Sequence, residues 1–61
     1  MLRSDKIALH YEVIANTANK IEKTSKELST LYKESFFNEN KANLRKKHLQ
    51  KYIEELEELL K

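Results

Sequence analysis

The sequence of 61 residues contains no glycine, proline, cysteine or tryptophan. Glycine and proline mark most turns, loops and strand ends, so a chain that lacks both favours long helices. The absence of cysteine excludes disulfide bonds. A domain of this size buries only about 60% of the surface that its unfolded chain exposes, and without disulfides it usually needs a metal or an oligomeric partner. We therefore expect an all-α protein that depends on something beyond its own core.

Residues that could carry out chemistry are few and scattered. His10 and His48 are the only imidazoles, and no thiolate is present to complete a tetrahedral zinc set with them, so a zinc site is not expected. Neither histidine lies in a pattern typical of a nucleophile and its base. A chain this short also offers no deep cleft in which a carboxylate could be desolvated and its pKa adjusted. We expect no enzymatic activity, no metal and no cofactor.

Long apolar runs are missing as well. The first six residues lack the apolar stretch of a signal peptide, and no segment approaches the roughly 18 consecutive apolar residues of a membrane span. The net charge of +2 is too small to indicate a field that attracts nucleic acid or a membrane. These features predict a soluble, cytoplasmic protein, and the lysine- and asparagine-rich composition is typical of a bacterial or phage accessory protein.

The first half of the chain carries a heptad pattern. Aliphatic side chains recur every seven residues, at Ile7, Ile14, Ile21 and Leu28. Four residues after each of them comes a second row, made of Tyr11, Ala18, Ser25 and Tyr32. The two rows form a narrow coiled-coil seam and predict one amphipathic helix from about residue 4 to about residue 36. Asn16 and Asn19 could split this helix, but the seam passes both without a shift of phase, which favours continuity.

A second helix is predicted after a turn at residues 37–40. Asn38 and Asn40 can each cap a helix, and Phe36 and Phe37 are expected to close the core beside the turn. The second helix should run from about residue 41 to about residue 60. Its main apolar face consists of Leu49, Tyr52, Leu56 and Leu59. Because a short turn makes consecutive helices antiparallel neighbours, we predict that residues 1–61 form a single helical hairpin domain.

The predicted helices differ in length. Pairing outward from a turn near Asn38 puts Lys61 opposite about Ala15, so the start of the apolar seam lies beyond the second helix. Exposed apolar surface costs about 25 cal/mol per Å², so we expect another chain to cover it, most simply a second copy in a four-helix bundle. A frayed terminus is the alternative. The predicted oligomer or partner interface comprises Ile7, Tyr11, Ile14, Ala18, Ile21, Leu28, Leu49, Tyr52, Leu56 and Leu59.

Charges on the second helix are segregated. Its first half carries the basic residues Lys41, Arg45, Lys46, Lys47 and Lys51. Its second half carries the acidic residues Glu54, Glu55, Glu57 and Glu58. This order opposes the helix dipole, so it calls for an explanation. In one interpretation, two antiparallel copies of this helix pair the basic half of each with the acidic half of the other. In a second, the pairs form inside the hairpin, with the acidic half facing Lys20 and Lys23 and the basic half facing Glu27 and Glu34. In a third, the charges form a solvated face.

The basic half also leaves a nucleic-acid function open. Phosphate contacts would come from Arg45, Lys46, Lys47 and Lys51. The sequence thus predicts a non-enzymatic protein–protein interaction module, expected to be a homodimeric regulator, inhibitor or scaffold, or else to pair with another helical protein. A small RNA- or DNA-binding regulator is the alternative.

Overall fold

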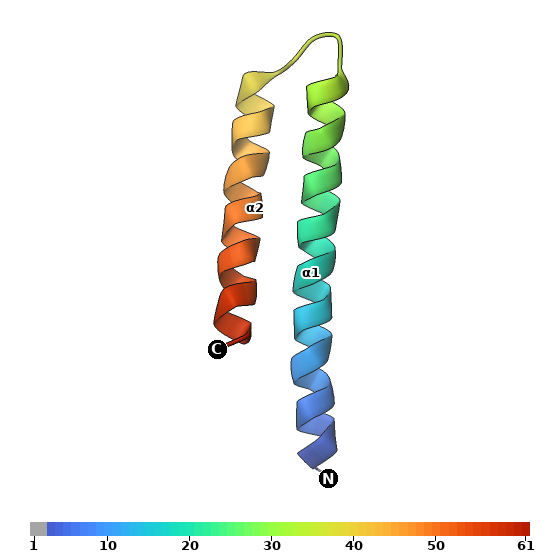
Figure 1. The fold of residues 1–61 in the computed structure, drawn as a ribbon, viewed down its shortest axis with the longest axis vertical. Coiled ribbons are helices and arrows are strands. Elements are labelled where there is room, and N and C mark those ends of the chain that lie inside the picture. The colour runs from blue at the N-terminus through green and yellow to red at the C-terminus, as the bar shows by residue number, and fades with distance from the viewer. Residues whose placement is uncertain (1–2) are drawn as a thin grey trace.

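The computed structural model describes the backbone of residues 3–61 and the side chains of residues 5–61, and it shows two helices lying antiparallel (Figure 1). Helix α1 spans Arg3–Lys33 and helix α2 spans Glu39–Leu59. The predicted all-helical hairpin is confirmed. Helix α1 runs through Asn16 and Asn19 without a break, so the expected continuity is confirmed too. The result is a rod that measures 53 × 16 × 12 Å.

The turn lies earlier in the chain than predicted. Helix α1 ends at Lys33 rather than near Phe36, and α2 begins at Glu39 rather than near residue 41. Asn38 is the N-cap: its backbone is extended (φ −100°, ψ 100°), and its side-chain Oδ1 accepts a hydrogen bond from the Lys41 N–H at 3.1 Å. Glu39 then places a negative charge in the first turn, where the helix dipole favours it.

The cap can be tested against the other asparagine of the turn region. Asn38→Ala is expected to lower the free energy of unfolding by about 1 kcal/mol, because the Lys41 N–H loses its acceptor. Asn40→Ala is the matched control: Asn40 lies inside α2, where alanine has the higher helix propensity, so no loss is expected. Urea denaturation monitored by circular dichroism measures both. Equal losses for the two variants would contradict the assignment of the cap.

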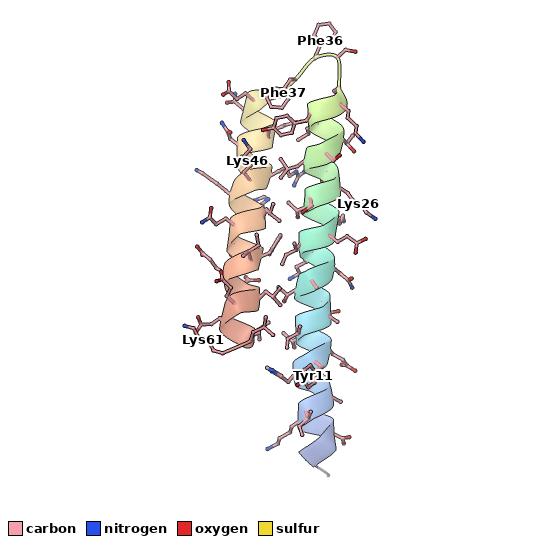
Figure 2. All side chains as sticks on the ribbon, viewed as in Figure 1. Tyr11, Lys26, Phe36, Phe37, Lys46 and Lys61 are labelled. Atoms are coloured by element: carbon pink, nitrogen blue, oxygen red, sulfur yellow. The ribbon has the colours of Figure 1, made fainter. Side chains whose placement is uncertain are left out.

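The aromatic residues of the turn do not form the predicted plug. Phe36 is 92% exposed and points away from both helices at the tip of the hairpin (Figure 2). Phe37 lies against the ring of Tyr32, with centroids 4.7 Å apart. The expectation was wrong for Phe36 because the turn occupies only residues 34–38 and places Phe36 near its apex. At this end of the hairpin the buried apolar side chains are those of Leu31 and Ala42.

Two contacts between the helices fix their register. Arg45 Nη2 lies 3.4 Å from Glu27 Oε2, and Lys20 Nζ lies 5.6 Å from the centroid of the Tyr52 ring. The two contacts are one heptad apart on both helices, and one heptad further on the same register brings Leu59 opposite Val13. Helix α2 therefore reaches about one turn further along α1 than predicted, because α1 ends earlier. The N-terminal part of α1 still extends beyond α2 (Figure 1).

Candidate interaction surface

Three rows of side chains with seven-residue spacing lie along one side of α1, and their burial differs sharply. The first row is buried and consists of Thr17, Thr24 and Leu31. The second is half-buried and consists of Ile14, Ile21 and Leu28. The third is exposed and consists of Tyr11, Ala18, Ser25 and Tyr32. Burial falls from row to row, so the first row packs most closely against α2.

The burial of these rows is inverted relative to their hydrophobicity. Thr17 and Thr24 are only 5% and 6% exposed, whereas Ile14 and Ile21 beside them are only partly buried. Thr17 tolerates burial because its Oγ1 donates a hydrogen bond to the Val13 carbonyl oxygen at 3.0 Å. Isoleucine gains more from leaving water than threonine does. The hairpin therefore buries its most apolar row only in part.

The row that contacts α2 differs from the one that the heptad pattern suggests. In the heptad pattern, the isoleucine row and the row of Tyr11 and Ala18 together form the seam. Within the hairpin, the rows that α2 covers are instead the threonine row and, in part, the isoleucine row. Periodicity locates an apolar stripe and does not say which edge of the stripe another helix covers. Threonine gives little signal in a hydrophobicity pattern, because its methyl group can pack while its hydroxyl group counts as polar.

The predicted interface residues fall into two groups in the structure. The half-buried group is Ile14, Ile21, Leu28, Leu49, Tyr52, Leu56 and Leu59. The exposed group is Ile7, Tyr11 and Ala18. Leu9 and Val13, which are 60% and 40% exposed, lie outside the predicted interface. Both lie off the heptad seam, so the seam pattern could not identify them.

The side of the hairpin that carries the second and third rows is apolar and uncovered. Lys46 Nζ lies 5.5 Å from the centroid of the Tyr32 ring, which shows that the third row of α1 and the Lys46 side of α2 face the same way. Heptad steps from Lys46 lead to Ile53 and Leu60, which are 40% and 65% exposed. We name this surface the open face. Its residues are Ile7, Tyr11, Ile14, Ala18, Ile21, Ser25, Leu28, Tyr32, Lys46, Leu49, Ile53, Leu56 and Leu60.

The residues that define the open face include no acid, and Glu54 and Glu57 border it on α2 in a groove shared with Leu49 and Ile53. The other side of the hairpin is polar, since it carries the Glu27–Arg45 ion pair and the contact of Lys20 with Tyr52. His48 lies on that side too, half-buried, with its ring centroid 6.5 Å from that of Tyr52. The hairpin is thus two-sided. One side carries an ion pair between the helices, and the open face carries the contact of Lys46 with Tyr32 but no ion pair between described residues.

The apolar surface continues onto the part of α1 that extends beyond α2. Ile7, Leu9 and Tyr11 are 54%, 60% and 63% exposed there. Figure 2 shows Tyr11 beyond the end of α2 that carries Lys61. Contiguous exposed apolar surface on a small soluble protein marks an interaction site more often than chance allows. The extension and the open face form one continuous candidate surface, because Ile7 and Tyr11 belong to both.

The four basic residues considered for nucleic-acid binding do not form one face. Arg45 pairs with Glu27, and Lys46 lies over Tyr32 on the open face. Lys47 and Lys51 are exposed, one turn apart. A separate open depression of about 400 Å³ near the turn is lined by Lys23, Lys26, Glu27, Thr30, Leu31, Lys41 and Arg45. Arg45 lines this depression, Lys46 lies on the open face, and Lys47 and Lys51 belong to neither group. The four basic residues therefore have different surroundings.

Ion pairs offset part of the positive charge around this depression. Lys26 Nζ lies 2.9 Å from Glu22 Oε1 one turn earlier on α1. The hydrogen bond from Lys26, and then its charge, lower the pKa of Glu22, and the same contacts raise the pKa of Lys26. Both side chains are well exposed, so solvent screening leaves the pair a small role in stability. Of the pairs considered within the hairpin, Glu27–Arg45 is the one seen between described residues.

The described residues show neither a metal-ligating cluster nor a membrane-spanning helix. Within residues 5–61 no three His, Asp or Glu side chains gather in a way that could hold a metal ion. Neither α1, as far as it is described, nor α2 has the length and apolarity needed to cross a bilayer. Comparisons with protein-family models, with curated proteins and with solved structures gave no significant match to this chain.

Proposed function

We propose that this chain is a non-enzymatic protein–protein interaction module that is completed by a second copy of itself. Two hairpins bury their open faces against each other and form a four-helix bundle. The assembled bundle then acts as a regulator, inhibitor or scaffold by presenting its outer helix faces to another macromolecule. The inverted burial on α1, with threonines buried and Ile14 and Ile21 only partly buried, is the observation that supports this proposal.

The surface area of the single chain supports the same proposal. It exposes 5310 Å², whereas a compact monomer of this mass would expose about 4,200 Å². The excess accessible surface is roughly 1,100 Å². In a standard interface each partner buries about 800 Å², which is a similar area. The open face of a second copy could cover this excess area, because it has the same length and the same apolar character as the surface that it would cover.

Light scattering on the purified chain tests the proposal. We expect a molar mass of twice the 7.3 kDa of one chain at micromolar concentration, with helicity falling as dilution dissociates the dimer. A folded, fully helical monomer at the same concentration would contradict the proposal. If that monomer instead bound RNA or DNA with an affinity that fell log-linearly with salt, the nucleic-acid alternative would replace it.

A further inference from the structure

We infer that the second copy lies antiparallel to the first, about a twofold axis that passes between Ala18 and Ile21 of α1 and beside Tyr52 of α2. This inference rests on the proposed self-association and adds its orientation and register. A twofold interface is self-complementary, so each residue that contacts another in the partner is matched by the reverse contact. Three features of the hairpin point to this particular axis.

The first feature is the distribution of side-chain size along the open face of α1. In an antiparallel pair with this axis, each aliphatic residue of the second row meets a residue of the third row. The resulting layers are Ile7–Tyr32, Tyr11–Leu28, Ile14–Ser25 and Ala18–Ile21, each formed twice. Every layer then combines an aliphatic side chain with a larger or smaller one, as close packing requires. A parallel pair would instead stack Ala18 on Ala18 and Ser25 on Ser25, which leaves cavities between tyrosine layers.

The second feature is the position of the extension of α1. With this axis, the Ile7 end of one copy lies beside the turn end of the other. Tyr32 and Phe37 stack there and remain 54% and 45% exposed in the single hairpin. Ile7 is itself 54% exposed. The Ile7 end of each copy therefore lies against the Tyr32 and Phe37 end of the other copy. The part of α1 that extends beyond its own α2 is then covered by the partner.

The third feature is the charge order of α2, which is independent of side-chain size. The contact of Lys20 with Tyr52 places Tyr52 at the level of the axis. The charge of α2 changes sign at this level, between Lys51 and Glu54. Rotation about the axis therefore brings the basic half of one α2 to the level of the acidic half of the other. This arrangement explains a charge order that opposes the helix dipole.

A groove on α2 repeats this charge order locally. It has a volume of about 420 Å³ and is lined by Lys46, Leu49, Gln50, Ile53, Glu54 and Glu57. Lys46 lies at one end, Glu54 and Glu57 lie toward the other, and the apolar Leu49 and Ile53 lie between them. A second copy of the same groove, reversed end to end, complements it in charge and presents Ile53 near the axis.

Engineered disulfides test the orientation, because the natural chain contains no cysteine. Ile7→Cys and Tyr32→Cys replace side chains that are 54% exposed, so both leave the buried Leu31 and Ala42 in place, and Tyr32→Cys removes only the exposed contacts of that ring with Phe37 and Lys46. In the inferred dimer, position 7 of one copy shares a layer with position 32 of the other, whereas the two positions 7 are about 37 Å apart. A disulfide needs Cα atoms less than about 7 Å apart.

In a glutathione redox buffer, an equimolar mixture of the two variants is expected to form the mixed disulfide in at least about tenfold excess over the two self-linked disulfides together. Each variant alone should remain mostly uncross-linked while light scattering still gives a dimer. A dimer in which each variant links to itself is parallel and would overturn the inference while leaving the proposed function intact. A dimer that links in neither case uses another register or face and also overturns the inference. A monomeric mass for both variants and the unmodified chain would refute the proposed function instead.

Discussion

Ile14→Asp is expected to dissociate the proposed dimer and to remove most of its helical circular dichroism signal. Ile14 is half-buried in the hairpin, and in the proposed bundle the second copy covers the rest of it. An unpaired carboxylate at this position would be buried without a partner, which costs about 3 kcal/mol or more in each chain. A domain this small has only a few kcal/mol of stability to lose.

Asn19→Asp is the control for this prediction. It adds the same charge to the same helix, but at an exposed position on the side opposite the isoleucine row. Sedimentation and circular dichroism should show a dimer with unchanged helicity for Asn19→Asp and a dissociated, largely unfolded chain for Ile14→Asp. If Ile14→Asp sedimented as the same folded species as the unmodified chain, the open face would not be the site of association.

Leu31→Ala is expected to lower the free energy of unfolding by about 2–4 kcal/mol. Leu31 is 9% exposed and is the one large aliphatic side chain that is buried among the described residues. It lies in the first row, near the buried Ala42 at the turn end of the hairpin. Removing its side chain leaves a cavity that a short turn and a small neighbour cannot refill.

Leu44→Ala provides the matched comparison, because Leu44 is 52% exposed on the outer side of α2. Its loss should change the free energy of unfolding by less than about 0.5 kcal/mol. Urea denaturation at one fixed protein concentration measures both variants, since the stability of a dimer depends on concentration. Similar losses for the two leucines would show that the core is not where the structure places it.

The sequence was sufficient for the fold because its signals act over many residues. A chain without glycine and proline has few places to turn, and a seam that keeps its phase past Asn16 and Asn19 predicts one long helix. The choice between Asn38 and Asn40 as the cap was not predictable, because both can accept the capping hydrogen bond. The choice of cap depends on where α1 ends. Because α1 ends at Lys33, before Phe36 and Phe37, the turn is complete by Asn38 and α2 begins directly after it.

The candidate surface was only partly predictable, for a physical reason. The stripe of packable side chains on α1 is three rows wide. It can be covered by α2 of the same chain, by the proposed second copy, or partly by each. Packing with α2 decides that Thr24 and Leu31 lie inside and that Ala18 lies outside, and no single-helix periodicity contains this information. The basic residues were predicted as a set, but consecutive helix positions point in different directions, so Arg45 and Lys46 reach opposite sides of the hairpin.

The threonine row also affects how the hairpin responds to temperature. The heat capacity change of unfolding grows with newly exposed apolar area and shrinks with exposed polar area. Thr17, Thr24 and Ala42 take places in the contact surface where large aliphatic side chains would contribute more to this heat capacity change. The stability curve of an isolated hairpin is therefore expected to be flatter than that of a hairpin with an aliphatic contact row, and the proposed assembly would add to its curvature.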